Sequence, residues 1–188
     1  MIRPGTCCRL CLATVLAVGS LCWRPVFAAR QTATSPEVVV GRFCRLDFEG
    51  VSLASANPLS HEFAELVSGD EEWPSEPIEI VRAFHVGSSK IHKETAAVTV
   101  RYDLLGNLSG ALESDKLVVA DGTETVAFPL IREGGRWKVK VFNLPPHVSV
   151  GALRKHIQGV MEDDEKRGDS HRTAILEALI AKLDALSK

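Results

Sequence analysis

The residues best suited to chemistry in this chain are six histidines, five cysteines and a single tyrosine. The histidines stand at positions 61, 85, 92, 147, 156 and 171, and no two of them have the His-x-x-x-His spacing of paired metal ligands. The sequence also lacks the Gly-x-Ser-x-Gly turn of a serine hydrolase, a Walker loop and a dinucleotide-binding glycine fingerprint. We therefore expect neither a bound metal nor a cofactor.

Cys44 is a candidate nucleophile, but it has no neighbouring cysteine and falls on an apolar helix face beside Val40 and Phe43. A buried free cysteine usually behaves as a small hydrophobic residue. We therefore favour a structural role for Cys44 over a catalytic one.

The start of the chain has the pattern of a secretory signal peptide. Residues 1–36 contain no Asp or Glu, Arg3 and Arg9 supply positive charge, and residues 10–23 form an apolar run of 14 residues. That run is shorter than the ~20 residues of a membrane-spanning helix. Val26-Phe27-Ala28 then offers a cleavage site after Ala28. We expect residues 1–28 to be the signal peptide, the remainder to be exported (periplasmic or secreted), and membrane contact only through an uncleaved leader.

Cleavage changes the charge and the cysteine content of the chain. It leaves 160 residues, lowers Lys plus Arg from 22 to 19 and keeps all 24 Asp and Glu, so that the net charge becomes 19 − 24 = −5. An acidic chain without a basic cluster argues against nucleic-acid binding. Because four of the five cysteines lie in the leader, Cys44 alone remains and no internal disulfide can form.

Helical patterns precede a run of strands. Ser35-Pro36-Glu37 is a strong helix start, with a capping hydroxyl, a proline at the first helical position and an acid near the positive helix end. Gly50 can end this helix, and Asn57-Pro58 opens a shorter one that ends near Gly69. Strands are predicted over residues 78–86, 96–105, 123–131 and 136–142, with Gly106-Asn107 breaking the second of them.

Two strands show one apolar and one polar face. Val98, Val100 and Tyr102 share a face, and Trp137 and Val139 alternate with lysines. After Pro145-Pro146 ends the sheet, Ser149 can cap a helix. A charged run over residues 162–167 separates that helix from a last one, whose apolar stripe is Ile175, Leu176, Leu179, Ile180, Leu183 and Leu186.

The hairpin over residues 132–141 (REGGRWKVKV) resembles one that is common in the NTF2-like superfamily, and the order of two helices followed by a curved antiparallel sheet is similar as well. The resemblance covers residues 35–147, although residues 106–121 hold no counterpart of that superfamily's third helix. It implies an α+β fold with N-terminal helices packed on a curved sheet around an apolar pocket. The candidate pocket-lining residues are Val98, Val100, Tyr102, Trp137 and Val139. We expect a signal peptide (1–28), an NTF2-like domain (29–148) and a helical extension (149–188).

The same superfamily includes ketosteroid isomerases and scytalone dehydratase, which raises the alternative of an enzyme. Such chemistry needs a carboxylate base together with an acid or a tyrosine. Tyr102 with His85 is the pair the resemblance suggests, while Asp103 points to the opposite face because strands alternate. The apolar face of the predicted sheet lacks convergent polar groups, so we favour a non-catalytic domain that binds an apolar small molecule or a partner protein. A further alternative is a structural subunit, such as a homodimer, that assembles through the C-terminal helices.

Overall fold

The computed structural model describes residues 34–54, 56–69, 77–110, 112, 116–140 and 144–186, which all lie in one compact unit of the chain. The predicted signal peptide lies outside the described residues, as does Val141 of the last predicted strand. Within the described part, helices and a five-stranded sheet make up an α+β fold with a C-terminal helix pair, as the sequence predicted.

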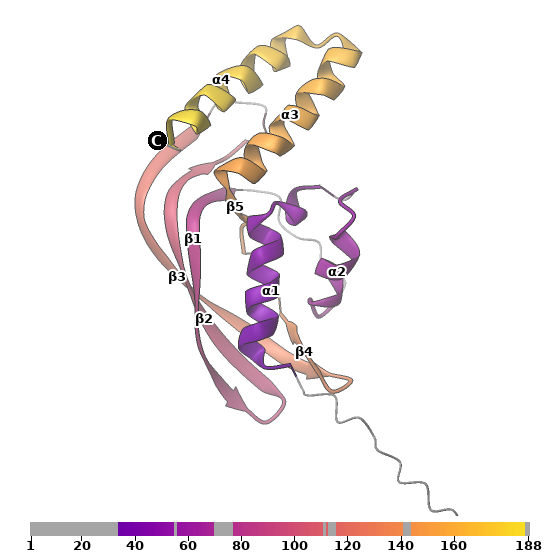
Figure 1. Cartoon of the computed structure of the whole chain (residues 1–188), viewed down its shortest axis with the longest axis vertical. Coiled ribbons are helices and arrows are strands. Elements are labelled where there is room, and N and C mark those ends of the chain that lie inside the picture. Colours follow the sequence, from indigo (N-terminus) through magenta and orange to yellow (C-terminus); the bar gives the residue numbers. More distant parts are fainter. Residues whose placement is uncertain are drawn as a thin grey trace, which may run out of the picture. The chain divides into compact units, whose positions relative to one another are not determined.

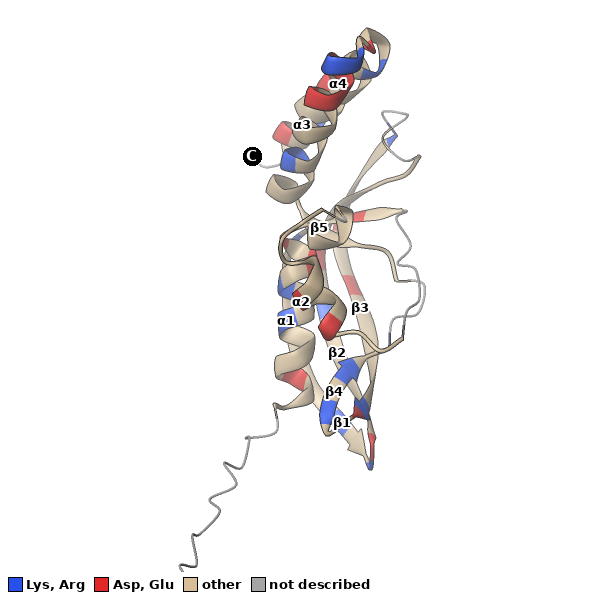
Figure 2. Cartoon of the chain, turned by 90° about the vertical axis from the view of Figure 1, so that its right-hand side faces the viewer, with Lys and Arg blue, Asp and Glu red and all other residues tan. Residues whose placement is uncertain are grey.

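The first helix, α1 (Pro36–Phe48), begins and ends where its sequence predicts. The Ser35 hydroxyl accepts a hydrogen bond from the Val38 amide at 3.4 Å, and Pro36 occupies the first turn. Gly50 follows with a φ of 79°, a left-handed conformation that glycine adopts at no steric cost. A short 3-10 turn, η1 (Val51–Leu53), and the helix α2 (Ser60–Glu65) complete the N-terminal helices, which lie on one face of the sheet (Figures 1 and 2).

The sheet has the order β4-β3-β2-β1-β5 and curves around α1 (Figure 1). Its strands are β1 (Ile78–His92), β2 (Thr95–Leu108), β3 (Leu117–Glu133), β4 (Arg136–Val139) and β5 (His147–Ser149). Neighbouring strands pair antiparallel except β5, which pairs parallel to β1. Gly134 and Gly135 have φ values of 56° and 81° and form the predicted hairpin turn between β3 and β4.

Two sequence predictions about this sheet are wrong. Gly106-Asn107 does not break β2, because Gly106 instead allows the β3 backbone to approach closely: an added Cβ there would clash with the carbonyl oxygen of Val118. Pro145-Pro146 does not end the sheet, since β5 follows at once and pairs with Glu79 to Val81 of β1.

The core lies between α1 and the sheet. Val40, Phe43 and Cys44 of α1 are at most 1% exposed and cluster with the inward-facing residues of β2, β3 and β4. Aromatic contacts contribute, with the Phe43 and Phe128 rings 5.5 Å apart. This is the apolar face that the alternating pattern of β2 predicted.

The C-terminal helices form a hairpin of α3 (Val150–Arg167) and α4 (Ser170–Leu186). Ser149 caps α3 through a 3.1 Å hydrogen bond from the Ala152 amide, as predicted. The charged run over residues 162–167 is the last part of α3 and does not separate the helices; Gly168, with a φ of 78°, does so. A second apolar cluster joins this hairpin to β1 and β2. No helix among the described residues is long and apolar enough to cross a membrane.

Candidate functional site

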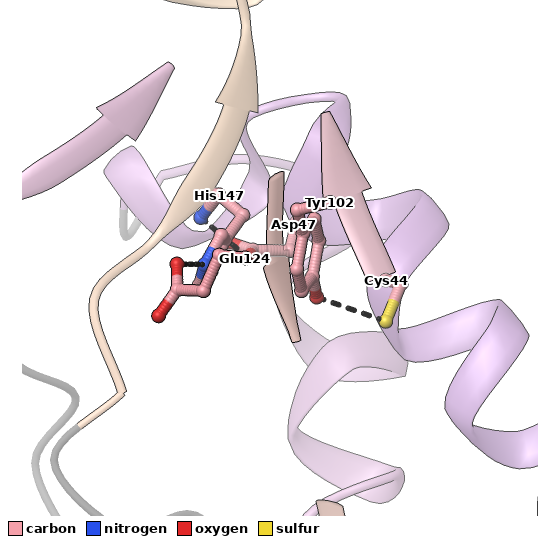
Figure 3. A network of polar contacts seen from close by, with 5 residues as sticks. All are labelled: Cys44, Asp47, Tyr102, Glu124 and His147. Atoms are coloured by element: carbon pink, nitrogen blue, oxygen red, sulfur yellow. Dashed lines mark hydrogen bonds and ion pairs between the residues drawn. The ribbon is translucent and has the colours of Figure 1, made fainter. Parts of the chain in front are cut away.

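Polar side chains from α1, β2, β3 and β5 meet around Tyr102 (Figure 3). Tyr102 is 1% exposed, and its hydroxyl lies 3.2 Å from the Cys44 sulfur. Its ring stacks on the His147 imidazole, with centroids 3.9 Å apart and planes inclined by 18°. The arrangement arises because β2 directs Tyr102 inward, while β5 at the far edge of the curved sheet brings His147 over the ring.

Asp47 lies on the last turn of α1 and is 1% exposed. Its carboxylate accepts a hydrogen bond from the Ser52 hydroxyl at 2.5 Å and one from the His147 backbone amide at 2.7 Å. Burial raises the pKa of Asp47 to about 7, because a charged carboxylate loses its hydration there and the two hydrogen bonds restore only part of it. Near neutral pH this group therefore exists in both protonation states.

His147 and Glu124 connect the buried group to the surface. Glu124 is the cross-strand neighbour of Tyr102, and its carboxylate lies 3.4 Å from Nε2 of His147. The His147 side chain is 2% exposed and that of Glu124 is 41% exposed. Burial lowers the pKa of His147, an effect that Glu124 opposes. The half-buried Glu79 has a raised pKa, first from burial and then from the Glu124 charge.

The remaining two groups are held in their neutral forms. Burial raises the pKa of the Cys44 thiol to about 12, so Cys44 is a protonated thiol and not a nucleophile at neutral pH. Burial also raises the pKa of Tyr102 well above its ordinary value, and the neighbouring Cys44 and Asp47 add to this. Among the described residues, no group of three or more His, Cys, Asp or Glu side chains could hold a metal ion.

The structure brings the predicted lining residues together inside the core. Val98, Val100 and Val139 are 0% exposed, Tyr102 is 1% and Trp137 is 8%. All five belong to the cluster that packs against α1. Trp137 also lies under the Arg132 guanidinium, 5.7 Å from the ring centroid.

His85 does not meet Tyr102. In the β1–β2 register Phe84 pairs with Tyr102 and His85 pairs with Arg101, so His85 lies on the opposite face of the sheet. There its imidazole is 54% exposed and 3.3 Å from Asp103. His147 takes the place beside Tyr102. The sequence offered little sign of this, because His147 follows two prolines and its strand has only three residues.

An open cavity of about 380 Å³ lies at the turn between α3 and α4. Its lining includes Glu165, Asp169 and Glu177 and none of the residues predicted from the sequence. The polar group around Tyr102 and this cavity are therefore separate features.

Comparison with known proteins finds a likeness at the level of structure only. No family model matches the sequence, and no curated protein matches it. A structural match is a crystal structure from Campylobacter jejuni described as a candidate NTF2-like transpeptidase, with 12% identity and a TM-score of 0.31. The match covers 58% of this chain and 100% of the other. The transpeptidase description belongs to that protein.

Proposed function

We propose that this chain is an exported, non-catalytic binding domain whose partner is another protein. The observation that supports this proposal is the closure of its interior polar group. Cys44, Asp47, Tyr102 and His147 are each at most 2% exposed, and each has a partner within the chain. A general acid or base must come within hydrogen-bond distance of its substrate, and these side chains are covered by the protein itself.

The contacts of the group favour a structural role for it. Asp47 links the end of α1 to η1 through Ser52 and to β5 through the amide of His147. Tyr102 then joins β2 to α1 through Cys44 and to β5 through the stacked imidazole. A buried polar network whose members satisfy one another fixes the relative position of the elements that carry it. Binding would then take place on the outer surface.

A ketosteroid assay tests the non-catalytic part of this proposal. The mature chain should neither isomerise a β,γ-unsaturated ketosteroid nor gain thermal stability from it, because Val98, Val100 and Val139 already pack against α1 in the interior. Absorbance of the conjugated product and a thermal melt with increasing steroid give the two readouts. Turnover, or a saturable rise in melting temperature, would contradict the proposal.

General acid–base catalysis is the second candidate, because Glu124 gives His147 and Tyr102 a route to the surface. Tyr102→Phe keeps the ring and its stacking and removes only the hydroxyl. Suppose that the assay detects turnover and that the Tyr102 hydroxyl takes part in proton transfer. The turnover rate of this variant should then be lower by on the order of 100-fold or more. His85→Ala is the matched control, since His85 lies on the other face of the sheet.

A further inference from the structure

The third strand of the sheet has an open side. β3 pairs with β2 along most of its length, but β4 covers only Leu130 to Glu133. Just before that, the amide of Lys140 donates to the carbonyl of Pro129 at 2.8 Å. On this side of residues 117–128, no described strand pairs with β3, and Figure 1 shows its outer edge free along the middle of the sheet.

The hydrogen bond at Pro129 identifies the backbone groups that face the open side. A strand residue directs its N–H and its C=O to the same neighbour, and successive residues alternate between the two neighbours. The Pro129 carbonyl points to the β4 side. Because no register shift separates these residues from Pro129, the backbone N–H and C=O groups of Thr123, Thr125 and Ala127 point to that side as well. All three are exposed. With respect to the described residues, the open side therefore presents three backbone donors and three acceptors in the spacing of a strand partner.

This edge lacks most of the devices that keep strands from pairing. Natural edges are often interrupted by lysine, proline or a bulge. Residues 122–128 contain no Lys, Arg or Pro, and the register shift opposite Leu104 and Gly106 lies just before them. The segment is thus a regular stretch of seven residues between that shift and β4.

The charge on the edge is acidic. Asp121 and Glu124 are the ionisable residues within residues 117–128, and Figure 2 shows basic residues near β4 and on the helices. A residue paired opposite Glu124 on an added strand would place its side chain beside the Glu124 carboxylate, and opposite charges in that position stabilise pairing. Pairing of two copies through this edge would gather two Asp121 and two Glu124 side chains with no base between them.

We propose that the open side of β3 binds an extended segment of a partner protein that carries Lys or Arg opposite Glu124, adding a strand to the sheet. The backbone groups of Thr123, Thr125 and Ala127 supply the pairing, and the acidic side chains select a basic segment. This inference rests on the proposed binding function and names the class of partner.

Three synthetic peptides test it against the isotope-labelled mature chain. The first alternates lysine with threonine or valine, the second has glutamate in place of lysine, and the third is the first peptide N-methylated at its threonine and valine amides. We expect only the first to shift the amide resonances of Thr123, Thr125 and Ala127 and to slow their hydrogen exchange. Equal binding of all three peptides, or no response at these amides, would overturn the proposal.

Matched variants locate the site on the protein. Thr125→Pro removes one edge donor and should abolish binding of the lysine peptide, whereas Thr125→Val keeps the donor and should bind normally. Asp121→Asn should weaken binding roughly two- to fivefold, the range of an exposed charge pair. If Thr125→Pro does not fold, the N-methylated peptide still tests the same hydrogen bonds.

Two further outcomes have distinct meanings. Resonance changes at the β3 edge that follow protein concentration without peptide would overturn the proposal in favour of a second copy of the chain. Steroid turnover would overturn the non-catalytic function, and it is read independently of the peptide titration. The two failures can therefore be told apart.

Discussion

The ionisation of Asp47 is coupled to folding. Its pKa rises from 3.8 in the unfolded chain to about 7 in the fold because it is buried. The native state therefore holds a proton that the unfolded state has released, and stability falls as pH rises through the folded pKa. His147 acts in the other direction: its pKa is lowered from 6.5, so stability is lost as pH falls below that value.

The two effects overlap near pH 6.5, where unfolded histidine is half protonated, but the histidine contribution is common to the wild type and to Asp47→Asn. Between pH 6.5 and about 8, the wild type should therefore lose about 1 kcal/mol of unfolding free energy relative to Asp47→Asn, which cannot ionise at this position. Urea denaturation at a series of pH values measures both.

Asp121→Asn is the control for this measurement, since Asp121 is exposed and should leave the wild-type slope unchanged. Glu124, Tyr102 and Cys44 surround the Asp47–His147 pair and are identical in all three proteins. An Asp47→Asn slope equal to that of the wild type would assign the pH dependence to another group.

Tyr102 and His147 show how far the sequence predicted individual side chains. The inward direction of Tyr102 followed from its phase with Val98 and Val100, and the structure places it in that core. The neighbour of Tyr102 was not predictable, because it depends on the curvature of the sheet. That curvature brings β5, which pairs with β1, over a residue of β2.

Gly106 gives a prediction at the scale of the paired strands. Gly106→Ala would place a Cβ against the backbone of Val118, which cannot move without disturbing the β2–β3 pairing. We expect it to lower the free energy of unfolding by about 1–3 kcal/mol, the usual cost of overpacking. Chemical denaturation gives the value, and hydrogen exchange should show faster opening of Asn107 and Leu108.

Gly122→Ala is the matched control on the facing strand. A Cβ at Gly122 has no atom within 4 Å, so alanine meets no obstacle there. Reducing the freedom of the unfolded chain should leave stability unchanged or raise it by up to about 1 kcal/mol. Equal losses of stability from Gly106→Ala and Gly122→Ala would show that the close approach of the Val118 backbone is not the cause of the Gly106→Ala destabilisation.

The helices and strands were predictable to different degrees. Ser35-Pro36-Glu37 and Ser149 are local signals, since a helix cap depends on residues a few positions away, and both caps form as predicted. The lengths of β1 and β3 were underestimated, since the strands predicted over residues 78–86 and 123–131 extend over Ile78–His92 and Leu117–Glu133 and include Gly87 and Gly122. Whether a glycine ends a strand depends on its partner strand, which is distant in sequence.

Export is a prediction about the whole chain. The basic start, the apolar run of 14 residues and Val26-Phe27-Ala28 predict removal of the leader. Mass spectrometry of protein from the exported fraction should find a chain that begins at or near Ala29. Recovery of an intact Met1 terminus in the membrane fraction would contradict this.

The C-terminal helix gives a second prediction at this scale, on what its apolar side contacts. Leu176, Leu179 and Leu183 of α4 are 0% exposed and cluster with Leu153 and Ile157 of α3 and with residues of β1 and β2. The polar side of α4 adds an ion pair between Asp184 and Arg154 at 3.0 Å. The three leucines at the centre of the apolar stripe are therefore covered within one copy of the chain, and the rest of the stripe is half-buried.

Leu179→Ala should accordingly cost about 2–5 kcal/mol, as a large-to-small change in a core does, whereas the exposed Glu177→Ala should stay within about 0.5 kcal/mol of the wild type. Deleting residues 170–188 would expose Leu153 and Ile157 and should lower both solubility and melting temperature.

The melting temperature of the intact chain should not vary with protein concentration. If a second copy covered the apolar stripe, the melting temperature would rise with concentration. A flotation assay with anionic vesicles tests the alternative that α4 binds lipid. If the intact mature chain floats with the vesicles and the shortened chain does not, α4 contacts lipid through its apolar side, and the packing of that side within the chain is contradicted.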